Sequence, residues 1–140
     1  MQNQATLSGP SMLVGSIHYT LRSVPITCLG LTLASDIFYL QTSNLLWLHF
    51  SEWLLLAGVL FGAVAILLAF VDFLIRRIRP SWPTVLCSIV VLVLATFNNL
   101  VHTADGWTAV YPLGLTLSVA TVLAMLLTGW AGRKGDRHVW

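Results

Sequence analysis

The basic residues of this chain are confined to three clusters that alternate with pairs of long apolar segments. All seven Lys and Arg residues belong to these clusters, namely Arg22; Arg76, Arg77 and Arg79; and Arg133, Lys134 and Arg137. The two other polar turns, Thr42–Ser51 and Thr103–Thr108, contain neither Lys nor Arg. A chain that crosses a bilayer four times and keeps its basic loops in the cytoplasm has this pattern. We therefore predict a polytopic membrane protein with both termini inside.

The composition supports a membrane protein, because 57% of the residues are hydrophobic and only 9% are charged. A transmembrane helix needs about 20 predominantly apolar residues. Four segments meet this condition, at about residues 24–41, 53–75, 82–101 and 109–130. We predict an all-α, four-helix transmembrane domain over residues 17–132, after a polar tail (1–16) and before a basic cytoplasmic tail (133–140).

Small residues at helical spacing indicate where the helices approach one another. Gly58 and Gly62 form a Gly-x-x-x-Gly motif in the second segment, and Gly30 and Ala34 repeat the spacing in the first. Small residues let helix backbones pack closely in lipid, where no hydrophobic force drives association. We expect the tightest helix contact at Gly58 and Gly62.

Ionisable and amide side chains inside the segments are the first candidates for function, because such groups are costly in a membrane. Asp36 lies in the outer half of the first segment, and Asn98 and Asn99 lie near the outer end of the third. One interpretation is that the Asp36 carboxyl bonds to Asn98 or Asn99 and locks the two helices. The other is a ligand or proton role. Asp72 is explained by a helix-end ion pair with Arg76, four residues later.

Histidine depth limits the candidate haem sites. His49 and His102 are expected at the outer face, and His18 and His138 at the inner face, so each pair could either hold b-type haem or be interfacial histidines in water, which the spacing alone favours. Crossed pairs are separated by about 30 Å of hydrocarbon. The set His49, Glu52 and His102 is a weaker metal alternative, and we predict no metal site. The cofactor is unknown, with b-type haem and quinone as the two candidates.

The chain lacks the sequence signatures of soluble-enzyme chemistry and of nucleic-acid binding. No phosphate-binding loop, nucleophile elbow or H-E-x-x-H motif is present. The basic residues mark the ends of segments and do not form a basic face, so we expect no nucleic-acid partner. We predict that the protein is not an enzyme.

Several stretches resemble the DUF2231 family of small bacterial membrane proteins. These are Ile17–Ile26 followed by Asp36; the run Gly58…Ala69…Asp72; and Asn99, Asp105-Gly106-Trp107, Pro112-x-Gly114 and Thr128-Gly129-Trp130-x-Gly132. Two positions depart from the family pattern: Tyr19 replaces the usual Pro, and Ser23 replaces the usual second His. His18 is retained and His138 falls near a His often seen after the last helix. The resemblance implies a redox association.

Together these observations predict an accessory or anchoring subunit of a larger assembly, plausibly redox-associated, in a bacterial inner membrane. Its partners would be the lipid bilayer and membrane or peripheral subunits. The alternative is a b-type haem- or quinone-binding electron-transfer protein. A third hypothesis is a small transporter or proton channel that uses Asp36 and Asn99.

Overall fold

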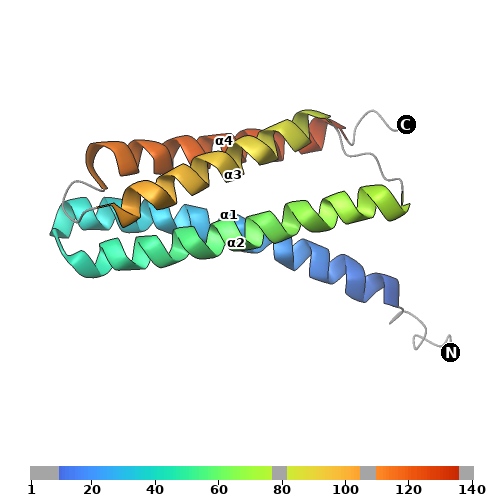
Figure 1. The fold of residues 1–140 in the computed structure, drawn as a ribbon, viewed down its shortest axis with the longest axis horizontal. Coiled ribbons are helices and arrows are strands. Elements are labelled where there is room, and N and C mark those ends of the chain that lie inside the picture. The colour runs from blue at the N-terminus through green and yellow to red at the C-terminus, as the bar shows by residue number, and fades with distance from the viewer. Residues whose placement is uncertain (1–9, 77–81, 105–109, 136–140) are drawn as a thin grey trace, which may run out of the picture.

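Four long antiparallel helices make up the computed structural model, which describes residues 10–76, 82–104 and 110–135 (Figure 1). The helices are α1 (Pro10–Thr42), α2 (Leu45–Arg76), α3 (Trp82–Thr103) and α4 (Leu115–Gly135), and a short π-helical turn, η2 (Val110–Gly114), precedes α4. The described residues contain no strand. The predicted all-α class is confirmed.

Each helix includes a stretch that is long and apolar enough to cross a membrane. These stretches are Tyr19–Thr42, Leu45–Ile75, Trp82–Thr103 and Val110–Trp130. Many large apolar side chains are exposed on the outside of the bundle, as lipid contact requires. The predicted number of spans is therefore confirmed.

The two ends of the bundle differ in chemistry. We call the end where α1 and α3 begin and α2 and α4 finish the basic end, because Arg22, Arg76, Arg133 and Lys134 lie in helix segments near it. Arg77, Arg79 and Arg137 lie outside the described residues. The opposite end, with the α1–α2 turn, the last turn of α3 and η2, is the distal end.

The α1–α2 turn is much shorter than the sequence pattern suggests. A turn is expected over Thr42–Ser51, which contains no Lys or Arg, yet only Ser43 and Asn44 are non-helical. Asn44 caps the new helix, because its Oδ1 accepts a hydrogen bond from the Leu46 backbone N–H at 3.0 Å. Ser43 has a positive φ of 50°. A two-residue turn holds α1 and α2 side by side and antiparallel.

α1 also extends further than predicted. It begins at Pro10 rather than near Ile17, and Pro25 lies inside the helix. At the other side of the distal end, Tyr111 interrupts η2 with extended backbone (φ −122°, ψ 131°), next to a cis Tyr111–Pro112 peptide bond.

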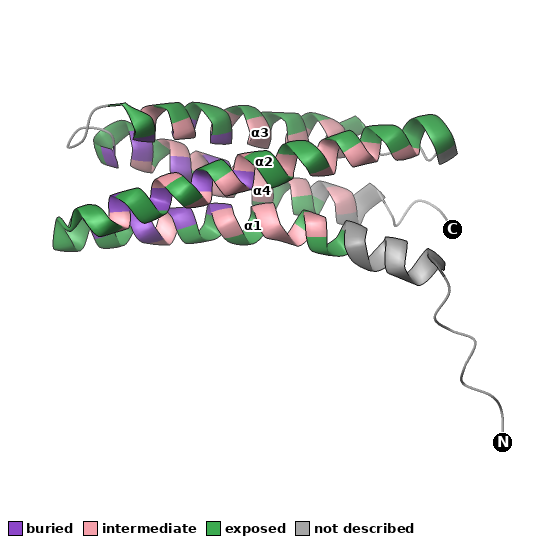
Figure 2. Cartoon of the chain, turned by 60° about the horizontal axis from the view of Figure 1, so that its bottom comes forward, coloured by how far each residue is buried: buried purple, intermediate pink, exposed green. Residues whose placement is uncertain are grey.

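The buried core occupies only the distal half and the middle of the bundle (Figure 2). No side chain is buried within 19–28, 59–75, 82–94 or 122–130, the described parts of the four helices toward the basic end. Figure 1 shows the first half of α1 diverging from the other helices at that end. Lipid accommodates helices that diverge, because an apolar side chain is about as stable in contact with lipid as in contact with another helix.

Of the two glycines in the Gly-x-x-x-Gly motif of α2, Gly58 lies closer to α1. A Cβ atom at Gly58 would lie 3.1 Å from Leu29 Cδ2 and 3.5 Å from Cys28 Cβ. At Gly62 a Cβ would meet Leu92 Cδ1 at 3.5 Å, which is ordinary contact. Gly30 has nothing within 4 Å of such a Cβ, so it does not line a tight helix contact.

We expect Gly58→Leu to destabilise the bundle by about 1–3 kcal/mol, because the added side chain must displace Leu29. Unfolding of the purified protein in mixed micelles measures the effect. Gly30→Leu is the matched control, since it adds the same side chain to an open helix surface. Equal stability of the two variants would show that the contact at Gly58 does not hold α1 against α2.

A buried polar site around Asp36

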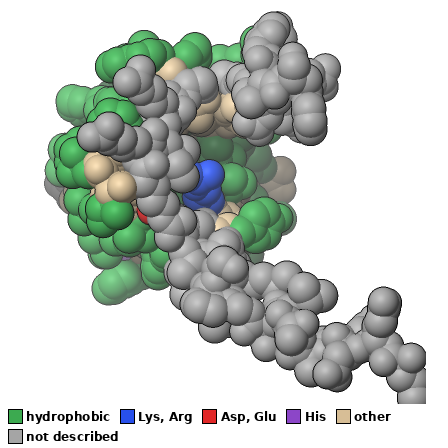
Figure 3. Space-filling view, turned by 90° about the vertical axis from the view of Figure 1, so that its right-hand side faces the viewer, with side chains coloured by type: hydrophobic (Ala, Val, Ile, Leu, Met, Phe, Trp, Pro, Cys, Tyr) green, Lys and Arg blue, Asp and Glu red, His purple; other side chains and the backbone are tan. Residues whose placement is uncertain are grey.

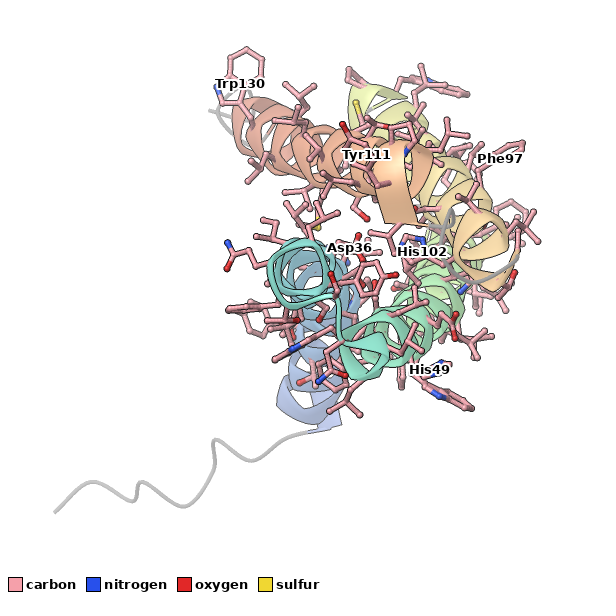
Figure 4. All side chains as sticks on the ribbon, turned by 90° about the vertical axis from the view of Figure 1, so that its left-hand side faces the viewer. Asp36, His49, Phe97, His102, Tyr111 and Trp130 are labelled. Carbon is pink, nitrogen blue, oxygen red and sulfur yellow. The ribbon has the colours of Figure 1, made fainter. Side chains whose placement is uncertain are left out.

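The Asp36 carboxyl is the centre of a hydrogen-bonded network that joins all four helices (Figure 4). Ser51 Oγ of α2 donates to Asp36 Oδ1, and Ser118 Oγ of α4 donates to Oδ2, each at 2.5 Å. His102 Nε2 of α3 lies 3.0 Å from Oδ1. Asp36 itself is 0% exposed. One side chain of α1 therefore contacts a polar side chain from each of the other three helices.

Asn98 extends the network along α3. Its Nδ2 donates to Ser118 Oγ at 2.8 Å, and its backbone carbonyl lies 3.0 Å from His102 Nδ1. Its side-chain Oδ1 is buried and has no hydrogen-bond partner among the described residues. Asn98 thus reaches Asp36 through Ser118 and His102, and it leaves one acceptor open inside the bundle.

Two apolar layers enclose this network. Toward the distal end lies a cluster of Tyr39, Leu48 and Val110, with Trp47 packed against it. Toward the middle lies a second cluster built on Leu29, Leu55 and Ala95. On α2 the helix repeat places Leu48 in the first layer, Ser51 in the network and Leu55 in the second layer. The carboxyl is therefore separated from water in both directions along the bundle.

The polar surroundings continue beyond Asp36. Thr32, Ser35 and Thr121 are also buried, and each hydroxyl donates to a backbone carbonyl of its own helix. Because each hydroxyl proton is donated within its own helix, these side chains need no partner on another helix. Most fully buried side chains of the distal half are consequently polar, which inverts the usual arrangement of a water-soluble bundle.

Hydrogen-bond directions assign the imidazole of His102. A backbone carbonyl can only accept, so Nδ1 carries a proton that it donates to Asn98 O. Nε2 therefore faces Asp36 either as a second donor or as an acceptor. The arrangement is not that of a serine nucleophile, because both serine hydroxyls donate to the carboxyl and neither is bonded to the imidazole.

The sequence-predicted polar residues separate into two groups. Asp36, Asn98 and His102 come together in the network, whereas Asn99 is only half-buried and forms no part of it. The prediction that Asp36 bonds directly to Asn98 or Asn99 is wrong. Its direct partners are Ser51, His102 and Ser118, because these side chains project into the bundle at the depth of Asp36.

His49 and His102 are not brought together as a haem-ligating pair. The His49 side chain is 65% exposed on α2, with Nδ1 at 3.4 Å from Glu52 Oε2, and it points away from His102 (Figure 4). Both ring nitrogens of His102 already have partners. The described residues include no group of three or more His, Cys, Asp or Glu that could hold a metal ion. The His18 side chain and all of His138 lie outside the described part.

Ser51 and Ser118 are the functional candidates that sequence inspection missed. A serine in an apolar helix is common, and most of the described Ser and Thr hydroxyls bond to their own helix. The available signal was depth: Ser51 and Ser118 lie near the distal ends of their helices, as Asp36 and His102 do. Helical spacing alone does not say which serine faces the carboxyl.

Four membrane-spanning helices locked by a buried polar centre define a small polytopic integral membrane protein. The model of a family described as "Predicted membrane protein (DUF2231)" matches residues 15–138. The chain belongs to the DUF2231 family, as its sequence motifs predicted. No curated protein and no solved structure was found to match it.

We expect Ser118→Ala to destabilise the protein by about 1–2 kcal/mol, because Asp36 Oδ2 loses its donor and the Asn98 amide loses its acceptor. Unfolding in mixed micelles again gives the measurement. Thr116→Ala is the control, since the Thr116 hydroxyl on the same helix bonds only to the Leu113 carbonyl. A Ser118→Ala protein as stable as the control would mean that the network contributes nothing to the fold.

Proposed function

We propose that this protein is an accessory or anchoring subunit of a larger membrane assembly and has no catalytic centre of its own. The observation that carries the proposal is the restriction of the buried core to the distal half and middle of the bundle. The half toward the basic end has helices but no buried side chain among those described. A partner that packs between or against these helices would supply the missing core.

The surface of that half suits a membrane-embedded partner. On α2, Leu67 is 60% exposed, and Phe70 and Leu74 lie on neighbouring turns and are exposed as well. Figure 3 looks onto the basic end, and most of the described side chains in view are hydrophobic. Association of helices in lipid depends on close packing rather than on water exclusion. Helices that already diverge leave room for such packing.

The polar network favours a scaffold over a catalyst. Its hydroxyls, imidazole and amide N–H groups are bonded to one another or to backbone, and apolar layers lie on both sides. A network of this kind fixes the relative rotation of four helices, because each helix must present one particular side chain to the carboxyl. A rigid distal half would orient the half toward the basic end for contact with a partner.

Orientation and context complete the proposal. Basic loops are retained in the cytoplasm, so the basic end would face the cytoplasm and the Asp36 network would lie in the outer leaflet of a bacterial inner membrane. The redox association is taken from the family resemblance. It adds the expectation that the partner is itself a redox protein.

Site-specific photo-crosslinking in native membranes tests the proposal. With a benzophenone amino acid in place of Leu67, we expect a crosslinked band of one defined mass, because the partner covers this part of α2. Phe97 on α3 is the matched control position, with 59% of its surface exposed against 60% for Leu67, but it lies in the distal half. We expect no discrete protein adduct from Phe97.

Mass spectrometry of the excised band identifies the partner. Blue-native electrophoresis should then show both proteins in one complex that Leu67→Arg disrupts. Lipid adducts alone from both positions, together with migration of the chain as a monomer, would contradict an accessory role.

A further inference from the structure

We propose that Asp36 and His102 together form a buried binding site for one exchangeable proton. The two side chains come from α1 and α3, are separated by 66 positions in the sequence, and meet at 3.0 Å with both side chains 0% exposed. The ligand is the proton itself, held between a carboxyl oxygen and an imidazole nitrogen. The site does not depend on whether the protein has a partner.

The hydrogen bonds around Asp36 and His102 require one proton between Oδ1 and Nε2. His102 Nδ1 already donates its own proton to the Asn98 carbonyl. Ser51 and Ser118 donate theirs to Oδ1 and Oδ2, and Ser118 also accepts from the Asn98 amide. Without a further proton, the lone pair of Nε2 would face a lone pair of Oδ1. With it, the pair is either carboxylate and imidazolium or carboxylic acid and imidazole, and both forms are neutral overall.

Burial makes this neutral, singly protonated state the stable one. Loss of the proton would leave an uncompensated carboxylate, and gain of a second would leave an uncompensated imidazolium; either charge is costly in apolar surroundings. The site is also rich in acceptors, because Asn98 Oδ1 is buried without a donor among the described residues. An excess of acceptors favours retention of the shared proton.

Among the described residues, few other charged or titratable groups face the pair. From α1 the Tyr39 phenol lies toward the distal end, and from α4 the neighbour is the Ser118 hydroxyl. From α2, Glu52 follows Ser51 and acts electrostatically on His102, and Glu52 is itself paired with the exposed His49. His102 is one residue from the end of α3. The shortest way for the proton to reach water is therefore toward the distal end.

The test is the pH dependence of thermal unfolding of the full-length protein in nanodiscs. In the unfolded chain, free aspartate loses its proton at about pH 3.9 and free histidine at about 6.5, whereas the proposed site holds one proton. Stability should therefore be full between these two values, fall as the pH rises above about 6.5, and fall also in acid, where the unfolded chain binds a second proton. In His102→Gln the imidazole is absent, so the fall in stability above about pH 6.5 should disappear.

Asp36→Asn should reverse the slope of stability against pH. The buried imidazole then stays neutral in the fold, so protonation opposes folding and stability should rise with pH through about 6.5. His49→Gln removes the exposed imidazole at the same end and should keep the wild-type profile. ¹⁵N NMR of His102 in the wild type provides a measurement that needs no variant. Its Nδ1 should stay protonated, and the Nε2 signal of the folded protein should stay constant through about pH 6.5, because the shared proton is retained.

Parallel stability profiles in the wild type, Asp36→Asn and His102→Gln would overturn the proposal and leave only a fixed hydrogen-bonded contact. If either variant fails to fold, the NMR measurement decides alone. A change at Nε2 of the folded protein near about pH 6.5, as in a free histidine, would also overturn it.

Discussion

Burial of a single carboxyl group is the constraint on which the rest of this structure depends. A carboxyl inside a membrane-spanning helix must find hydrogen-bond partners or a compensating charge, because lipid supplies neither. Asp36 finds Ser51, His102 and Ser118, one from each of the other helices. Satisfaction of this group fixes the depth and rotation of all four helices together. Hydrophobic packing alone gives a bundle in lipid much less of this specificity, since the lipid tails are equally apolar.

The same constraint explains why the two halves of the bundle differ. The distal half contains the polar network between layers built on Leu48 and Leu55, and it is closely packed. Toward the basic end no comparable polar centre exists among the described residues, and α1 diverges from its neighbours. The protein thus combines a distal half held by a buried polar network with a half whose described side chains are all at least partly exposed. The proposed accessory role would use both halves, the first to hold the fold and the second to receive a partner.

Much of the architecture could be predicted because its causes are local. Helix number and approximate span positions follow from hydropathy, and Asp36, Asn98 and His102 could be selected as unusual residues at similar depth. The length of the α1–α2 turn could not be predicted in this way. From the sequence, the segment Thr42–Ser51 is expected to be a long turn, but Asn44 caps α2, and of the polar side chains that follow, His49 is exposed whereas Ser51 faces Asp36. Composition does not distinguish an exposed helical turn from a loop.

The sequence by itself determined the membrane class, the four spans and the family, since apolar length and motif residues act independently of how the helices pack. Only the tertiary structure decided the partners of Asp36, which are 15, 66 and 82 positions away. The rotation of each helix about its axis selects which of several equivalent polar residues faces the carboxyl. Because of this rotation, Asn98 and His102 belong to the network, whereas Asn99 and His49 do not. The helix rotation thereby brings Asp36 and His102 together as the proposed proton-binding site.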